Sequence, residues 1–561
     1  MDLTTITITA IALVLAAVLD LGLLRWLRRR RSAPPSEDHA PVPAKTQALP
    51  RLLGQLRIFL TPLPSEKGVR PSAPPEPVAK GALISSFLRY LRIDVLRQRS
   101  RRFRLCLALA GLAASTAIGL RFSGSVMVQG WQLWAWIAAL ALTSISLMPA
   151  RWPALPRGLP WGWLGGLLVV GLFLRAAFLE TIPGRLHPDE AGLALYTQIH
   201  VFPRPGLTVS PFVTGSVSQP TLHSYILSLA LAAAGKSITG LRLPSVIAGT
   251  LGILATYAAI AAVDNRRTAL LAAAVMTTYH YHIHWSRLAL NNIWDTLWVP
   301  LVLAAFAWGW KRRWSGGAVL AGLALGLSQY FYAGSKVAIL LLGLLIVQLW
   351  RQEPDRRRLG VHLGKLVATA FCAAVPIGLF ALRNPEVYFA RIPQVIGWYP
   401  EAAREITGSA SGWWGYLWYQ TTHSLGAYLI YSDITGFYGP GIAFTFGVSA
   451  LAFVLGVLWA IRTRRWLPLA WVLLTAFLGG FVLLVPPSSS HYVAAIPGIA
   501  WLVALPLDAL IARGWGKLAV VFLAAIMISD LIFYFGVYVP RGAPHLSVPF
   551  PTPALPQSPP G

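Results

Sequence analysis

The octapeptide GRLHPDEA, residues 184–191, places two acids side by side in a chain that contains few acids. It follows an apolar run at 161–180 and precedes a mostly uncharged stretch that leads to the next run. Only 20 of the 561 residues are Asp or Glu, so an acid pair beside an apolar run calls for a physical reason. The position of these carboxylates relative to a membrane therefore decides what the chain can do.

The composition predicts an integral membrane protein. The chain is 56% hydrophobic and 12% charged, with a mean hydropathy of +0.59. Soluble domains carry about 25% charged residues, so this chain is far too apolar for one. Its net charge of +27 comes from short basic clusters between apolar runs rather than from a continuous basic stripe. That pattern is typical of cytoplasmic loops and argues against a nucleic-acid partner.

Apolar runs recur along the whole chain. A helical span needs about 20 residues, and the runs predict an all-α bundle of about fourteen transmembrane helices. The runs lie at 3–24, 104–120, 131–149, 161–180, 244–263, 268–284, 294–310, 316–334, 337–350, 364–382, 441–461, 466–485, 493–511 and 517–537.

The basic clusters give the bundle a direction. They occupy alternate connections, which predicts that these connections are cytoplasmic and that the long ones at 181–243 and 383–440 are external. The segment 221–236 is only marginally long enough to span, so we expect it to lie along or dip into the outer face. The clusters lie at 151–157, 266–267, 311–313, 351–358, 462–465 and 513–517.

A juxtamembrane helix is predicted to begin at the octapeptide. Pro188 suits the first helical position, and Asp189 and Glu190 then lie in the first turn, where the helix dipole favours negative charge. Apolar residues at every fourth position from 191 to 199 predict a helix on the membrane surface with an apolar underside. The acids either cap this helix or perform chemistry. Neighbouring helical side chains point about 100° apart, so only one can face a given substrate atom.

A second external segment, 280–295, carries further polar residues. Arg287 and Asp295 could hold a phosphate and orient an acceptor or metal, or they could simply pair with each other. Histidines at the alternate positions 280, 282 and 284 do not converge on one ion from a helix, so we expect them to face the membrane interface.

Four motifs, in order, resemble those of the C-type membrane glycosyltransferases. This superfamily includes protein O-mannosyltransferases, lipid A aminoarabinose transferases and the catalytic subunits of oligosaccharyltransferases. The order and the predicted topology are similar over roughly residues 161–390. Ser218 and Gln219 replace an acid and a Lys of some relatives, and Asp295 stands alone where some have two acids. The motifs are HPDEA at 187–191, QPTLHSY at 219–225, LRLPS at 241–245 with GTL at 249–251, and Ser286-Arg287 with Asp295.

The resemblance implies a reaction at the outer face of the plasma membrane, within the cell envelope. A sugar, either a hexose or a pentose, would pass with inversion from a polyprenyl-phosphate donor to an acceptor hydroxyl. The acceptor would be a protein, a glycan or a lipid, and the donor chain would remain among the membrane lipids. We expect Asp189 to be the general base and Glu190 to orient it or contribute to a cation site.

The resemblance also implies roles for other residues. A divalent cation is left open, with Asp295 and either Asp189 or Glu190 as its ligands. The candidates for binding the donor phosphate are Arg287, Arg242, Arg185 and Lys336. The candidates for sugar or acceptor contacts are His187, Gln219, His223, His491 and Tyr492.

The chain is expected to divide into regions around a catalytic module. The alternatives to an enzyme are a flippase for lipid-linked sugars or another polytopic transporter, and a non-catalytic scaffold. A transporter should show internal repeats and polar groups near the bilayer midplane, and the sequence shows neither clearly. The regions are an anchor at 1–24, a basic Pro-rich linker with an amphipathic helix at 25–103, an accessory transmembrane hairpin at 104–160, the catalytic transmembrane module at 161–390, an outer aromatic loop with the last spans at 391–537, and a Pro-rich tail at 538–561.

Overall fold

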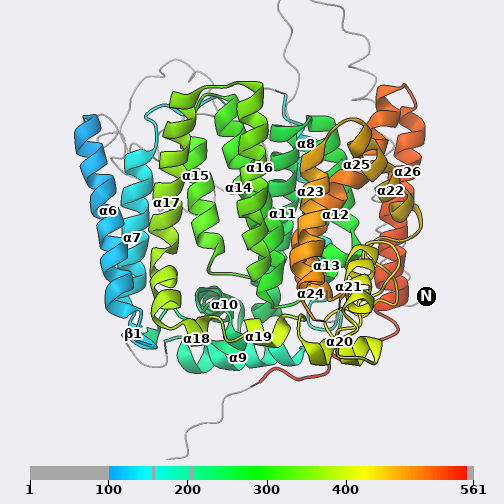
Figure 1. Cartoon of the computed structure of the whole chain (residues 1–561), viewed down its shortest axis with the longest axis horizontal. Helices are drawn as coiled ribbons and strands as arrows, with labels where there is room; N and C mark the ends of the chain where they lie inside the picture. Colours follow the sequence, from blue (N-terminus) through cyan, green and yellow to red (C-terminus); the bar gives the residue numbers. More distant parts are fainter. Residues whose placement is uncertain (1–99, 155–157, 203–205, 485, 552–561) are drawn as a thin grey trace, which may run out of the picture.

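The computed structural model describes residues 100–154, 158–202, 206–484 and 486–551. The predicted anchor at 1–24 and nearly all of the linker at 25–103 lie outside these residues. The described chain is mostly helical, and its long helices stand side by side as one bundle (Figure 1). These helices are α6 (Arg101–Phe122), α7 (Trp131–Leu147), α8 (Trp161–Ala176), α11 (Ile238–Val263), α12 (Arg266–Thr278) continued by α13 (His280–Ser286), α14 (Asp295–Lys311), α15 (Gly316–Ser328), α16 (Val337–Gln352), α17 (Arg356–Arg383), α22 (Gly447–Arg462), α23 (Trp466–Ala476), α25 (Ile496–Ala512) and α26 (Gly516–Leu531).

Among the described residues, 7 helices are long and apolar enough to cross a membrane. Shorter apolar helices of 10–17 residues, apart from the one at Leu222–Ala234, complete the bundle. The fold is therefore the predicted multi-spanning helical bundle, while the total of about fourteen spans stays a prediction. The candidate spans are Arg101–Phe122, Ile238–Val263, Asn291–Lys311, Ala333–Gln352, Arg356–Arg383, Ser489–Ala512 and Gly516–Tyr538.

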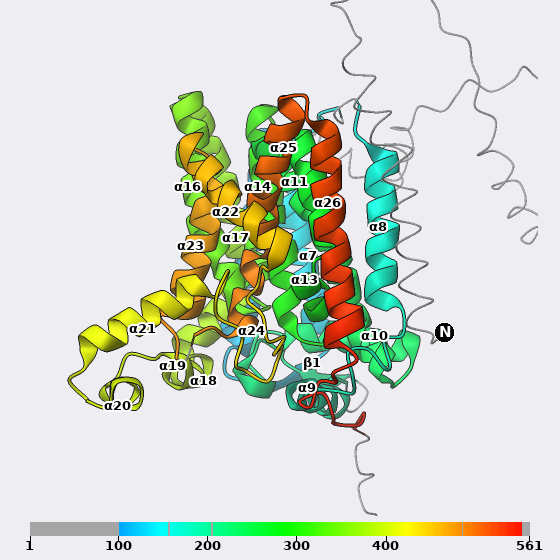
Figure 2. The ribbon, with the colours of Figure 1, turned by 90° about the vertical axis from the view of Figure 1, so that its right-hand side faces the viewer.

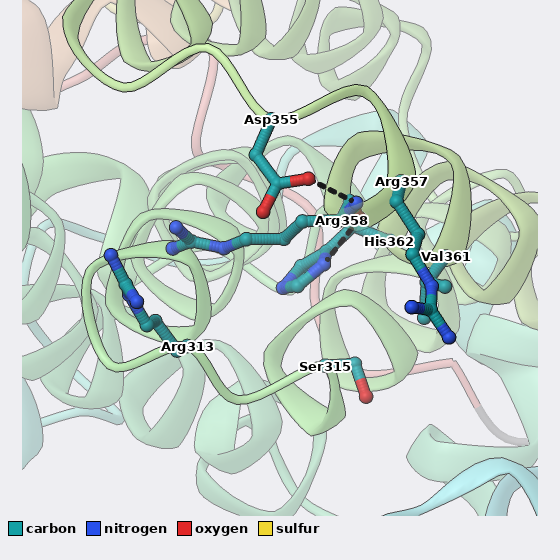
Figure 3. A pocket seen from close by; sticks show the side chains of 7 residues that line it. All are labelled: Arg313, Ser315, Asp355, Arg357, Arg358, Val361 and His362. Carbon is teal, nitrogen blue, oxygen red and sulfur yellow. Dashed lines mark hydrogen bonds between the residues drawn. The ribbon is translucent and has the colours of Figure 1, made fainter.

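Short elements gather at one end of the bundle, which we call the α9 end (Figures 1 and 2). The short basic connections between long helices lie at the opposite end, the basic end, where several arginines approach one another (Figure 3). The elements at the α9 end are β1 (Met127–Gln129), α9 (Pro188–His200), β2 (Leu207–Val209), α10 (Leu222–Ala234), α18 (Pro385–Tyr388), α19 (Ile392–Val395), α20 (Pro400–Thr407), α21 (Trp413–Gly426) and α24 (Ser489–Tyr492).

Helix α9 begins at Pro188, as predicted, but its buried face differs from the predicted one. The buried residues include Glu190, Leu193, Ala194 and Thr197, which follow the spacing i, i+3, i+4, i+7. Residues 195 and 199 of the predicted apolar underside are exposed instead. The buried face differs from the predicted one because Glu190 is held inside the protein, and this contact sets the rotation of the helix about its axis.

The segment predicted to lie at the outer face forms α10. This helix has 13 residues, fewer than the roughly 20 that a membrane span requires. It lies at the α9 end beside α9 and packs against α11 (Figure 1). A two-stranded antiparallel pair of β1 and β2 joins residues 127–129 to 207–209, and the sequence analysis did not foresee it.

Close helix packing explains the small residues of α11. A Cβ added at Gly249 would lie 2.1 Å from the hydroxyl oxygen of Ser286, and one added at Gly252 would lie 2.7 Å from that of Thr296. Small residues allow helices in a membrane to approach closely. The GTL motif at 249–251 therefore brings α11 against the chain segment that contains Arg287 and Asp295.

Candidate functional site

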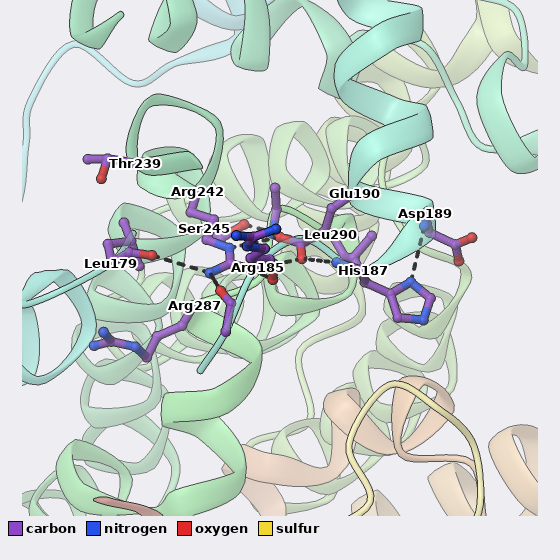
Figure 4. Close-up of polar contacts among 12 residues, drawn as sticks. Leu179, Arg185, His187, Asp189, Glu190, Thr239, Arg242, Ser245, Arg287 and Leu290 are labelled. Atoms are coloured by element: carbon purple, nitrogen blue, oxygen red, sulfur yellow. Dashed lines mark hydrogen bonds and ion pairs between the residues drawn. The ribbon is translucent and has the colours of Figure 1, made fainter. Parts of the chain in front are cut away.

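The two adjacent acids of the octapeptide occupy different environments (Figure 4). Glu190 is fully buried, and its carboxylate accepts hydrogen bonds from the backbone N–H of His187 at 2.9 Å and of Ala289 at 2.7 Å. It also forms a two-point ion pair with Arg242, with both N···O distances at 3.0 Å. Glu190 thus joins the start of α9 to α11 and to the segment after α13.

Arg242 is fully buried and has no free donor. Its five guanidinium N–H groups match five hydrogen bonds, two of them to Glu190. The other three go to the carbonyl oxygens of Leu179, Gly184 and Arg185 at 2.7–3.2 Å. Arg242 therefore fixes the backbone of the octapeptide and has no donor left for the predicted contact with the donor phosphate.

Asp189 is only half-buried, and its carboxylate accepts no hydrogen bond from the described residues. In Figure 4 it points away from the Glu190–Arg242 pair. Its backbone N–H donates to Nδ1 of His187 at 3.1 Å, so His187 caps the helix and its imidazole stacks on Phe437 with ring centroids 4.5 Å apart. Burial lowers the pKa of His187, whereas Asp189 and Glu190 act to raise it. The neutral ring is the form that accepts this bond.

The C-terminal segment supports the octapeptide from outside. Leu186 and Val548 exchange two backbone hydrogen bonds of 3.0 Å as an antiparallel bridge. Leu546 is buried against Gly184, and the side chain of Gln198 donates to the carbonyl oxygen of Pro551 at 3.0 Å. The predicted Pro-rich tail is thus a backbone partner of the acid-bearing loop over its described part.

Arg287 is also buried and bound to the backbone. Its guanidinium donates to the carbonyl oxygens of Leu174 at 2.6 Å, Ile182 at 3.2 Å and Ala177. These oxygens lie at or just beyond the end of α8, where carbonyls lack helical partners and a cation is favourable. Arg287 does not pair with Asp295, and its predicted role at the donor phosphate stays a prediction.

Arg175 performs a similar role and was missed by the sequence analysis, which placed it inside an apolar run. It is fully buried and donates to the carbonyl oxygens of Gly171, Met276 and Thr277 and to the Ser286 hydroxyl. The sequence did contain a signal for this role, because a charged residue inside an apolar run next to a predicted loop is unfavourable unless it has partners.

Asp295 lies in a second polar group at the α9 end. It is 1% exposed, and neither carboxylate oxygen has a hydrogen-bond partner among the described residues. Its charge interacts with that of Lys336, which is exposed at the start of α16. Nearby, the hydroxyl of Tyr332 lies 2.7 Å from Nδ1 of His491. Tyr332 also interacts electrostatically with Asp295, which places His491 beside this group.

The residues present do not fit the predicted divalent cation. Glu190 is saturated by Arg242 and two backbone donors, and Asp295 faces a lysine. Among the described residues, no three His, Cys, Asp or Glu side chains come together in an arrangement that could hold a metal ion. Glu190 is therefore not free to act as a metal ligand in this arrangement, and the alternative of Asp295 with Asp189 stays a prediction.

The remaining predicted contacts divide into buried and accessible residues. His223 is buried between Trp294 and Phe331, with no hydrogen-bond partner for Nε2 among the described residues, and the Tyr492 hydroxyl donates to the Ser424 carbonyl at 2.9 Å, so both side chains lie inside the protein. Three others remain accessible in part or in full: Gln219, whose side-chain oxygen accepts from Asn291 at 3.3 Å, Arg185 and His491.

The three alternate histidines do not face the membrane interface as expected. All three are fully buried, and each has a different partner. His280 contacts the Tyr438 hydroxyl at 2.7 Å, His282 contacts Arg175 at 2.7 Å, and His284 contacts the carbonyl of Phe437 at 2.8 Å.

The bundle and its candidate spans define a polytopic membrane protein. Residues 218–378 match the family model described as dolichyl-phosphate-mannose-protein mannosyltransferase. This match confirms the resemblance to the C-type membrane glycosyltransferases that the motifs predicted. The matched segment contains Gln219, Arg242, Asp295 and Lys336, whereas Asp189 precedes it. A search of curated protein sequences found no match to the chain.

A search of solved structures matched membrane glycosyltransferases at low identity. One is the archaeal oligosaccharyltransferase AglB from Archaeoglobus fulgidus with an inhibitory peptide and a dolichol-phosphate, at 16% identity and a TM-score of 0.43 over 70% of this chain and 56% of that one. Another is ArnT from Cupriavidus metallidurans bound to undecaprenyl phosphate, at 19% identity and a TM-score of 0.41 over 64% and 62%. A third is arabinosyltransferase EmbB from Mycobacterium smegmatis, at 12% identity and a TM-score of 0.44 over 74% and 45%. The chain thus covers 45–62% of the length of these three structures.

Proposed function

We propose that the chain is a membrane glycosyltransferase that moves a sugar from a polyprenyl-phosphate donor to an acceptor hydroxyl, with Asp189 as the general base. One observation carries the proposal. Of two adjacent acids, Glu190 accepts four hydrogen bonds in a buried network, whereas the half-buried Asp189 carboxylate accepts none. A general base needs a free carboxylate on a rigid support within reach of the acceptor proton.

The reaction needs a cation at the leaving phosphate. Arg242 has an acceptor for every donor and Arg287 is buried among carbonyl oxygens, so we assign this role to Lys336, with Arg185 as the other exposed candidate of the four predicted. Lys336 stands at the N-terminal end of α16, where the helix dipole also favours an anion. Attack by the acceptor opposite the phosphate inverts the anomeric carbon, and Asp189 takes the acceptor proton.

The proposed reaction takes place at the α9 end, on the extracytoplasmic face of the plasma membrane. The basic end would then be cytoplasmic, in keeping with the tendency of Lys and Arg to remain inside. The donor would keep its lipid chain in the bilayer while its sugar reaches the acids. The family model supports a lipid-phosphate-linked sugar donor over residues 218–378. The comparisons give no support to a flippase or another transporter.

Replacement of Asp189 tests the proposal. The full chain, reconstituted in vesicles, is given a polyprenyl-phosphate-linked sugar and an extract of envelope acceptors, and release of polyprenyl phosphate is measured. Asp189→Asn should slow release at least about 100-fold, because positioned proton transfer contributes about 10²–10⁴-fold. Glu386→Gln, an exposed acid in α18 at the same end, is the matched control and should remain active. Full activity of Asp189→Asn would exclude Asp189 from the chemistry.

A further inference from the structure

A cavity of about 280 Å³ opens at the basic end, away from the acids (Figure 3). It lies between the loop that joins α14 to α15 and the first turns of α17, whose N-cap is Asp355. Cationic and hydrogen-bonding side chains dominate its wall. The lining residues are Arg313, Ser315, Asp355, Arg357, Arg358, Val361 and His362.

Arg358 is the buried group of this cavity. Its side chain is 9% exposed and lies over the ring of Trp310, with 4.1 Å between the guanidinium carbon and the ring centroid. Nη1 lies 2.9 Å from a carboxylate oxygen of Glu353, but Nε and Nη2 have no hydrogen-bond partner among the described residues. Buried polar groups without partners are unfavourable, so this guanidinium is suited to an additional anion.

The surroundings of the cavity are strongly basic. Residues 311–313 and 351–358 together contain seven basic residues and two acids. Glu353 pairs with both Arg313 and Arg358, although its own side chain is 43% exposed. The two arginines thus share one carboxylate, in the way that they could share the oxygens of a phosphate.

An apolar surface continues from the rim of the cavity along α17. Val361, Val367 and Phe371 are 42%, 59% and 52% exposed and lie on one side of the helix. In a membrane-spanning helix such a surface contacts acyl chains. A ligand with a phosphate at one end and hydrocarbon at the other could therefore place its phosphate in the cavity and its hydrocarbon along the apolar surface of α17.

We propose that this cavity binds the headgroup phosphate of an anionic phospholipid from the leaflet at the basic end. Arg313, Arg357 and Arg358 would hold the phosphate oxygens, and the acyl chains would lie along α17 past Val361. Basic pockets between membrane helices are known to suit such headgroups on general electrostatic grounds. The site is separate from the proposed glycosyl transfer and does not depend on it.

The chain offers a matched pair of variants for the test. Arg313→Gln with Arg357→Gln removes two exposed cavity arginines, and Arg312→Gln with Arg356→Gln removes two exposed neighbours that do not line the cavity. The detergent-purified full chain is titrated with short-chain phosphatidylglycerol, and bound lipid is counted by native mass spectrometry. The first variant should bind about tenfold more weakly and the control within about twofold of the parent. An equal loss of lipid binding in the two double variants would indicate a general attraction of anionic lipid to the basic surface, and it would overturn the proposed site.

Two further arms sharpen the outcome. Glu353→Gln frees Arg313 and Arg358 from their shared carboxylate, so it should tighten phosphatidylglycerol binding several-fold, and weaker binding would contradict the proposal. Phosphatidylcholine, whose zwitterionic headgroup adds a choline cation to the phosphate, should bind more weakly than phosphatidylglycerol. Inorganic pyrophosphate should compete poorly because it lacks the hydrocarbon. Pyrophosphate that binds as tightly as the lipid, and is lost in the Arg313/Arg357 variant, would overturn the lipid as the ligand and leave a site for soluble phosphates.

Discussion

Arginine–glutamate contacts occur at both ends of the bundle, and they differ in what surrounds them. At the α9 end, the ion pair of Arg242 with Glu190 is fully buried and every guanidinium N–H has an acceptor. At the basic end, Arg358 shares an exposed Glu353 with Arg313 and retains unpartnered nitrogens. The first arrangement leaves no donor without an acceptor, whereas the second leaves buried donors that an anion could still bind.

The comparison shows that residue type and position near a loop do not define a phosphate site. Arg242 and Arg287 were expected to bind phosphate because the implied glycosyl transfer needs a cation at the leaving phosphate, yet carbonyl oxygens and, for Arg242, Glu190 bind their guanidinium groups. The number of donors left without acceptors separates a structural arginine from one that is available to bind. This criterion removes Arg242, whose five donors all have acceptors. Arg287 is buried among carbonyl oxygens, so the exposed Lys336 and Arg185 are the more accessible phosphate candidates.

The largest stability effect is expected for Arg242→Gln. This change leaves Glu190 charged and buried without its partner, and breaking a buried ion pair in this way costs about 3–5 kcal/mol. The apparent melting temperature of the purified full chain should therefore fall sharply. Arg185→Gln, an exposed neighbour, serves as the control and should leave it unchanged. A small effect for Arg242→Gln would show that the network at the α9 end is not structurally important.

Arg358→Gln should cost much less, about 1 kcal/mol or below, because its partner Glu353 is exposed and exposed pairs contribute little. The same melting assay measures this difference directly. A loss as large as that of Arg242→Gln would remove the contrast between the two ends. It would also identify Arg358 as part of the protein scaffold rather than as a ligand-binding group.

The smallest expected effect is a pH dependence at the start of α9. Burial holds the pKa of His187 below its ordinary value of 6.5, so the folded chain binds fewer protons here than the unfolded chain. Its capping contribution, about 1 kcal/mol, is complete above pH 6.5 and is lost as the pH falls through the lowered pKa. Melting at pH 7.5 and pH 5 should show a smaller difference in His187→Asn than in the parent. An unchanged difference would contradict this role.

The sequence was sufficient for features that depend on local patterns. Apolar runs located the long helices, Pro188 located the start of α9, and the limited length of 221–236 predicted that it is not a full span. These features follow from composition and helix termini, which neighbouring residues determine.

Contacts between distant segments could not be predicted in the same way. Glu190 and Arg242 are 52 residues apart, and nothing local shows that they meet. The burial of Arg175 within an apolar run and the bridge between Leu186 and Val548 likewise depend on how the helices assemble. The rotation of α9 was wrong for the same reason, because the Glu190 contacts outweigh its apolar spacing.

The bridge at Val548 has a consequence for biosynthesis. The loop that carries Asp189 forms early along the chain, but its partner strand is translated only after α26, and Pro551 reaches Gln198 from 353 positions further on. A nascent chain that has inserted every preceding helix still lacks the backbone bridge between Leu186 and Val548. Ordering of the Asp189 loop therefore requires translation to pass Val548, and a copy cut before Val548 would leave this loop without its backbone partner.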